Sequence, residues 1–179
     1  MEENKPVFTK PSAGKAALTY GLILGAVLIV LHLILFLLNI HKGTTGFIIT
    51  LAVIIAGITM ATLDYRNKKW NGFITYGKVV KIGFVTMLFA AIIVAVYTFI
   101  YHGYINPADM RDARIEATQQ IYNMGLDPEA ESQALKMQEF IHTPLVYSLA
   151  TIFSYALMGI IISLVVAIFI KKEESPSLS

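Results

Sequence analysis

The amino-acid sequence predicts an all-α, polytopic membrane protein with four transmembrane helices and an extracytoplasmic helical hairpin between spans 3 and 4. Composition is the first reason, because 56% of the 179 residues are hydrophobic, as is typical of an integral membrane protein. The second is that the apolar residues form four long runs without a formally charged side chain. The third is that basic residues gather near the ends of these runs.

The chain begins with a basic tail, residues 1–15, which contains three lysines and two prolines and is expected to be cytoplasmic. A first span is predicted over 16–40, a run long enough to cross a hydrocarbon core of about 30 Å. No small-residue cleavage pattern closes this run, so a retained span is favoured over a signal peptide. One face favours packing against a neighbouring span, with dimerisation as the alternative, because small residues recur there at helical spacing: Ala13, Ala17, Gly21 and Gly25.

A second span is predicted over 46–63, and the short turn before it makes spans 1 and 2 an antiparallel hairpin. Small residues recur at helical spacing here and again in the last span, where they allow helices to approach closely. We therefore assign helix packing to Gly21, Gly25, Gly57, Ala61, Gly159, Ser163 and Ala167.

The connector that follows, residues 64–81, is aromatic and contains five Lys and Arg residues, which mark it as cytoplasmic. We expect an interfacial helix over 68–81, because its apolar side chains fall on one helix face and its lysines on the other. The third span is predicted over 82–105, and three tyrosines at its far end suit a membrane–water interface. The predicted membrane-interface anchors are Trp70, Phe73, Tyr76, Lys78, Lys81, Tyr97, Tyr101 and Tyr104.

Residues 106–144 contain seven acidic and three basic residues and are predicted to be extracytoplasmic. Asn106-Pro107 and Asp127-Pro128 are signals for helix starts, and Gly125 is a signal for a helix end, so the segment predicts a helical hairpin. Each arm has one apolar stripe, and the two stripes can cover each other or lie on the membrane. A fourth span is predicted over 145–170, which completes a single membrane domain over 16–172, and residues 173–179 form a second cytoplasmic tail.

Charge asymmetry predicts the orientation of the four spans. Ten Lys and Arg residues lie on the side of the two tails, and four lie on the side of the acidic hairpin. Because positive charge marks the cytoplasmic side, we expect a multi-pass protein of the cell inner (plasma) membrane with both termini cytoplasmic. The membrane domain is then expected to be a four-helix bundle.

The four histidines, His32, His41, His102 and His142, all map to the extracytoplasmic half of the predicted topology. His32 is an ionisable side chain inside a span, which suggests a functional role, although a neutral imidazole can also hydrogen-bond between helices. A shared metal or pH-sensing site, with carboxylates such as Glu139 nearby, is one hypothesis, and simple interfacial placement is the other. His32 is expected to lie roughly 13 Å deeper than His41, too far to share an ion unless the helix unwinds.

Three short motifs in the sequence resemble a known family. They are Gly72-Phe73-Ile74-Thr75-Tyr76-Gly77, Lys81-Ile82-Gly83-Phe84 and Tyr104-Ile105-Asn106-Pro107. Over nearly its whole length the chain resembles the small bacterial membrane proteins of domain-of-unknown-function family 4199. The resemblance implies four spans with a helical segment before the last, and it brings no activity, cofactor or catalytic residue with it.

The sequence lacks signatures of intramembrane catalysis, such as paired carboxylates within spans or a HExxH motif, so we expect no enzyme activity, catalytic residue or cofactor. Cysteine is absent and no ligand spacing is found among the acidic residues, so no metal site is assigned. The net charge of +2 does not favour nucleic acid as a partner.

Two function hypotheses follow from these observations. The first is a non-enzymatic accessory or scaffold protein that binds a partner through the acidic hairpin or the small-residue helix faces. The alternative is a subunit of a small oligomeric transporter or channel, because four spans without a charge at mid-membrane offer no coupling site within one subunit. The expected partners are membrane lipids and either a second copy of the chain or another membrane protein.

Overall fold

The computed structural model describes residues 13–41, 43–69 and 72–172, and within them the chain is all-α, without a strand. Four of the helices are long and apolar enough to cross a membrane, the third of them together with the π-helical turn that follows it. The elements in chain order are α1 (Ala13–Leu37), α2 (Thr44–Lys69), α3 (Tyr76–Ile100), the π-helical turn η1 (Tyr101–Ile105), α4 (Pro107–Asn123), α5 (Pro128–Ile141) and α6 (Pro144–Ile170).

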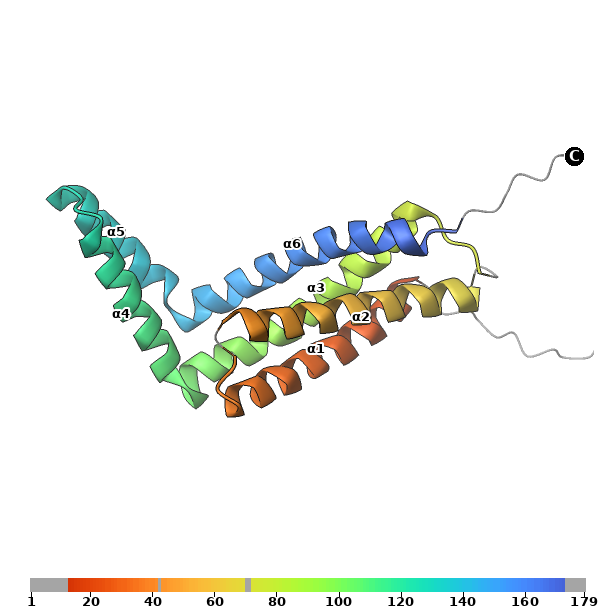
Figure 1. The fold of residues 1–179 in the computed structure, drawn as a ribbon, viewed down its shortest axis with the longest axis horizontal. Coiled ribbons are helices and arrows are strands. Elements are labelled where there is room, and N and C mark those ends of the chain that lie inside the picture. The colour runs from red at the N-terminus through yellow and green to blue at the C-terminus, as the bar shows by residue number, and fades with distance from the viewer. Residues whose placement is uncertain (1–12, 42, 70–71, 173–179) are drawn as a thin grey trace, which may run out of the picture.

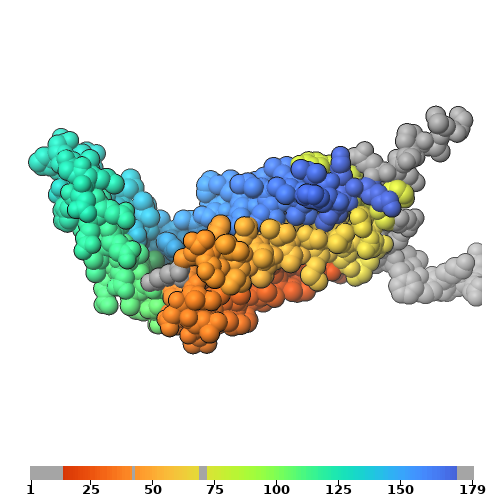
Figure 2. Space-filling model, in the orientation of Figure 1, coloured from red at the N-terminus to blue at the C-terminus, as the bar shows by residue number. Residues whose placement is uncertain are grey.

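The four long helices lie side by side, and α4 and α5 pair across one end of them (Figure 1). We refer to this end as the hairpin end. The space-filling view shows the α4–α5 pair projecting past α6, with a notch between the pair and the long helices (Figure 2). The hairpin is therefore joined to the long helices only near its base.

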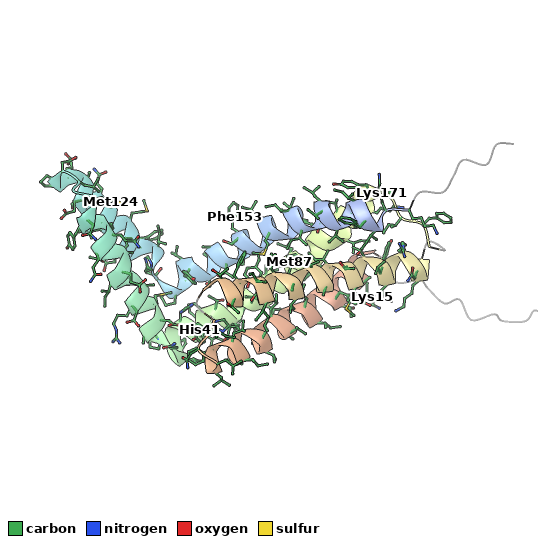
Figure 3. The ribbon with its side chains drawn as sticks, in the orientation of Figure 1. Lys15, His41, Met87, Met124, Phe153 and Lys171 are labelled. Atoms are coloured by element: carbon green, nitrogen blue, oxygen red, sulfur yellow. The ribbon has the colours of Figure 1, made fainter. Side chains whose placement is uncertain are left out.

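Helix α3 is central to the packing. It buries half of its apolar stretch, against 28% for each of the other three long helices. It packs along α1 on one side and α6 on the other, and α2 contacts all three. Met87 of α3 is fully buried midway along the long helices, whereas Phe153 of α6 is exposed on their surface (Figure 3).

Small residues let these helices approach closely. A Cβ added at Gly21 would lie 2.6 Å from Phe89 Cβ of α3, and one at Gly159 would lie 2.5 Å from Met87 Cβ. Gly25 also faces α3, and a Cβ at Gly57 would lie 2.6 Å from a methyl of Leu24. The small-residue face of α1 is thus occupied by α3 of the same chain. Of the two alternatives for this face, the structure therefore has packing within the chain and not dimerisation. The remaining predicted packing residues, Ala61, Ser163 and Ala167, are buried.

Helix α1 ends at Leu37 and not at residue 40. Asn39 adopts a left-handed conformation with φ 56°, which asparagine tolerates better than most residues. The Ile40 N–H donates to the Leu35 carbonyl and the Asn39 N–H to the Phe36 carbonyl, both at 3.0 Å. These two bonds form a Schellman motif, which terminates the helix and reverses the chain.

The prediction of a separate interfacial helix over 68–81 is wrong. Helix α2 continues past the apolar run to Lys69, helped by an ion pair of 2.8 Å between Asp64 and Lys68, and α3 already begins at Tyr76. The predicted span ended at residue 63 because the apolar run ends there. A helix, however, can continue through charged residues once it leaves the hydrocarbon core. Trp70 lies outside the described residues.

In the connection before α3, Ile74 forms an isolated antiparallel bridge with Lys172, just beyond the end of α6. The Ile74 N–H donates to the Lys172 carbonyl at 2.8 Å, and the Lys172 N–H donates back at 3.0 Å. The Tyr76 hydroxyl donates to the Leu164 carbonyl, and Lys172 Nζ lies 5.5 Å from the centre of the Phe73 ring. Of the predicted anchors here, Lys81 is exposed, and Phe73, Tyr76 and Lys78 are half-buried.

The two helices predicted between spans 3 and 4 are present as α4 and α5. Asp127 caps α5, its Oδ1 accepting from the backbone N–H groups of Glu129 and Ala130 at 3.1 and 3.0 Å. Gln138 Nε2 donates to the Arg114 carbonyl at 2.7 Å and ties the arms together. The apolar stripes cover each other only in part, because some of their members are buried and others are exposed. Met110 and Ile121 are buried; Met124, Met137 and Ile141 are exposed.

We predict that Gly159→Leu loosens the α3–α6 contact. The added side chain has to displace Met87, and overpacking of this kind costs about 1–3 kcal/mol. Thermal unfolding in detergent, followed by circular dichroism, should show a lower midpoint. Ala150→Leu, at an exposed position of the same helix, is the control and should melt as the parent does. Equal midpoints for the two variants would contradict the close packing at Gly159.

Candidate functional site: a histidine pocket at the hairpin end

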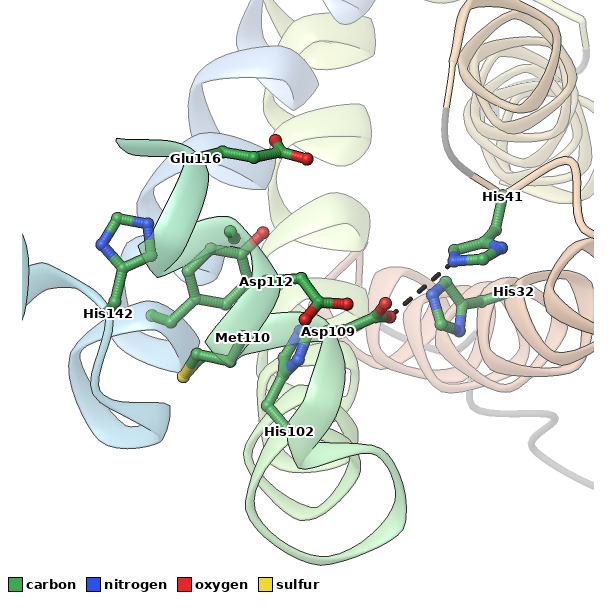
Figure 4. Close-up of a pocket in the computed structure, with 10 residues that line it drawn as sticks. His32, His41, His102, Asp109, Met110, Asp112, Glu116 and His142 are labelled. Carbon is green, nitrogen blue, oxygen red and sulfur yellow. Dashed lines mark ion pairs between the residues drawn. The ribbon is translucent and has the colours of Figure 1, made fainter. Parts of the chain in front are cut away.

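All four histidines line one pocket of about 340 Å³ at the hairpin end (Figure 4). We name this cavity the histidine pocket. Its side chains come from α1, the α1–α2 connection, η1, α4, the α5–α6 connection and α6. The lining residues are His32, His41, His102, Asp109, Met110, Asp112, Ala113, Glu116, His142 and Tyr147. The structure thus brings together side chains that the sequence placed only on one side of a membrane.

The Schellman reversal after Leu37 brings His41 back over α1. The His41 ring centre lies 6.1 Å from that of His32 and 5.1 Å from that of Phe36. The predicted separation of roughly 13 Å between the two histidines is therefore wrong, because it assumed that α1 continued to residue 40.

The π-helical turn η1 shapes the other side of the pocket. A 2.7 Å hydrogen bond from the Asn106 N–H to the Tyr101 carbonyl closes this wider turn, and π-helical turns are frequent at functional sites. Tyr101 is only 1% exposed, with its ring packed edge-on against His32 and His102. The prediction that Tyr101 anchors the chain at the membrane interface is therefore wrong, since the ring is part of the core.

The other two tyrosines predicted at this interface, Tyr97 and Tyr104, differ from each other in burial. Tyr97 is half-buried, and its hydroxyl is hydrogen-bonded to His32 Nδ1 at 2.8 Å. This bond joins α1 to α3, as expected for a histidine that links helices. Tyr104 is 76% exposed, as an interface anchor requires.

Asp109 joins η1 and α4 to the α1–α2 connection. The Tyr101 hydroxyl donates to Asp109 Oδ2 at 3.2 Å, and His41 Nε2 lies 3.7 Å from the same oxygen. Asn106 stands at the N-cap of α4, but its side chain makes no cap bond and donates its amide to the Tyr101 hydroxyl at 3.1 Å. The base of the hairpin is thereby held against the long helices.

The pocket has more hydrogen-bond acceptors than donors. Asp112 and Glu116 face it from α4 and form no ion pair with any part of the chain that the structure describes (Figure 4). Both ring nitrogens of His41 are shielded from solvent without a hydrogen-bond partner among the described residues. Over those same residues, no three histidine, aspartate or glutamate side chains are arranged to hold a metal ion.

A second pocket of about 190 Å³ adjoins the first and reaches further between the long helices. The two share His32, His102 and Tyr147, and the second extends past Thr151 to Tyr155. Further along α3, its side chains Met87, Ala90 and Ala91 are fully buried against the neighbouring helices. The polar lining therefore continues along part of the long helices and then gives way to close packing.

The sequence pattern points to the histidines, but the three carboxylates that line the same pocket were not predicted. Asp109, Asp112 and Glu116 recur at i, i+3 and i+7, which places them on one face of α4. That spacing is the available signal in the sequence for a carboxylate face on α4. Glu139, the carboxylate suggested as a partner, instead lies 4.0 Å from Arg114 Nη1.

We predict that Tyr101→Phe destabilises the hairpin end while preserving the core ring. It removes the donor to Asp109 and the acceptor for Asn106, a loss of about 1–2 kcal/mol for partly buried hydrogen bonds. The melting midpoint in detergent should fall. Tyr104→Phe removes an exposed hydroxyl and should leave the midpoint unchanged, so an equal fall in both variants would argue against this network.

Three comparisons with known proteins bear on identity. No curated protein matches the chain, and no solved structure matches it either. The family model described as "Protein of unknown function (DUF4199)" matches residues 19–172. The match covers α2 to α6 completely and all of α1 except its first residues. The chain therefore belongs to the DUF4199 family.

Proposed function

We propose that the protein is a non-enzymatic accessory protein of the bacterial inner membrane. In this proposal its long helices form a four-helix bundle in the bilayer, and the α4–α5 hairpin stands outside the membrane, where it engages a partner. One observation carries the proposal: the histidine pocket is lined by both the long helices and the base of the hairpin. A ligand in the pocket would therefore touch both the long helices and the base of the hairpin.

Charge supports the orientation. The start of α1, the α2–α3 connection and the end of α6 lie together, opposite the hairpin end (Figure 1). The sequence places ten Lys and Arg residues on that side and four on the hairpin side. By the positive-inside rule the tails belong in the cytoplasm and the hairpin outside.

The hairpin offers a surface suited to a protein partner, either a second copy of the chain or another membrane protein. Exposed apolar side chains stand among acidic ones on both arms and at the tip, where Met124 lies (Figure 3). They are Ile115, Tyr122, Met124, Met137, Phe140 and Ile141. Interfaces with partners are enriched in such aromatic and methionine side chains.

The alternative function, a subunit of an oligomeric transporter, is favoured by the second pocket, which takes polar side chains part of the way along the spans. The close contact of Gly159 with Met87 opposes a path through a single chain. A transport path in this alternative would run between subunits.

We predict the topology from the charge asymmetry, and cysteine accessibility checks it because the chain contains no cysteine. In intact cells, Ser132→Cys on α5 should react with a membrane-impermeant thiol reagent, and Lys68→Cys at the end of α2 should react only after permeabilisation. Both positions are exposed, so access to the reagent depends on the side of the membrane. The reverse labelling pattern would overturn the orientation.

We predict that Asp109→Ala frees the hairpin from the long helices, because Asp109 contacts both Tyr101 and His41. Spin labels at Ser132→Cys and Thr45→Cys, at exposed positions on α5 and α2, report the distance between the two parts. The distance distribution should broaden by several ångströms. Glu129→Ala, which removes an acid of the hairpin outside the pocket, should leave it narrow, and a narrow distribution in both variants would sink the coupling.

A further inference from the structure

We propose that the histidine pocket binds an organic ammonium ion, a protonated primary amine that is either free or part of a lipid headgroup. The proposal rests on the proposed function only in placing the pocket at the extracytoplasmic side. It is argued from the charge, the hydrogen-bonding groups and the size of the pocket.

Charge favours a cation. Asp109, Asp112 and Glu116 face the cavity from successive turns of α4, and the histidines add no charge while they are neutral. Arg114, a base on α4, is directed elsewhere, because its guanidinium donates to the His142 carbonyl and pairs with Glu139. The three carboxylates repel an anion and attract a cation, so the side of the cavity that α4 lines favours positive ligands.

The hydrogen-bonding groups favour a donor-rich ligand. An ammonium group has three N–H donors and no acceptor. The pocket offers the carboxylates of Asp112 and Glu116 together with His41, whose ring nitrogens have no hydrogen-bond partner among the described residues. A neutral imidazole presents one acceptor nitrogen, so a single ammonium ion can satisfy a carboxylate and His41 together.

Size favours an organic ion over a bare metal ion. A volume of about 340 Å³ falls at the lower end of small-molecule pockets, which measure about 300–1,000 Å³. No metal-holding group of three side chains occurs in residues 13–41, 43–69 and 72–172, so a metal ion would require rearrangement. The rings of Tyr147 and His102, with centres 5.0 Å apart, give the carbon chain of an amine an aromatic wall.

The test is calorimetric titration of the full chain, in neutral maltoside detergent at about pH 7.5, with putrescine and with ethanolamine. We expect saturable binding that weakens about tenfold or more in Asp112→Asn/Glu116→Gln, because charge-assisted hydrogen bonds are lost. The matched control is Glu129→Gln/Glu131→Gln, which makes the same charge change on α5 outside the pocket and should bind as the parent does. Helix content by circular dichroism confirms that each variant is folded.

Added lipid distinguishes the two sources of the ammonium group. If a headgroup occupies the pocket, phosphatidylethanolamine added to the micelles should compete with putrescine, and phosphatidylglycerol should not. If free amines are the ligands, neither lipid should compete.

Three outcomes would overturn the proposal. They are the absence of saturable binding by a folded chain, equal binding by the pocket variant and the parent, and binding of Zn²⁺ at the pocket without competition by either amine. None of them affects the spin-label measurement of hairpin coupling, which uses no ligand and therefore tests the proposed function separately.

Discussion

Close packing around α3 is the constraint on which the rest of the structure depends. Inside a bilayer the hydrophobic effect does not drive helices together, so association relies on van der Waals contact and interhelical hydrogen bonds. Gly21 and Gly25 of α1 and Gly159 of α6 let both neighbours lie against α3 at distances that a larger residue would not permit. This contact fixes where the ends of α1, α3 and α6 meet, and the histidine pocket lies at that meeting point.

The pocket itself is produced by three departures from regular helix geometry. The Schellman motif after Leu37 folds His41 back toward His32. The π-helical turn directs Tyr101 into the core and leaves Tyr104 exposed. The start of α4 at Pro107 then brings Asp109 within reach of Tyr101 and His41. Regular helices alone would leave these groups on separate surfaces.

The sequence predicts the features that depend on local signals and misses those that depend on contacts. The four long helices follow from the apolar runs, and α4 and α5 begin at Pro107 and Pro128 as predicted. The extension of α2 to Lys69 was missed because hydropathy reports the thickness of the membrane rather than the end of a helix. The burial of Tyr101 and the proximity of His41 to His32 depend on a π-turn and on a left-handed Asn39, for which a periodic pattern gives no signal. The carboxylate face of α4 was visible in the spacing, but its direction is set by tertiary packing.

The pairing of Ile74 with Lys172 also has a consequence for how the protein is made. Because α6 is the last of the four long helices to be synthesised, α1, α2 and α3 are complete before it, and α3 can pack against α1 while α6 is still absent. Until then the groove around Gly83 and Met87 has no helix to fill it, and the backbone groups of Ile74 have no partner from α6. Packing of α6 therefore does two things at once: it fills the groove beside Gly83 and Met87, and it brings Lys172 to pair with Ile74.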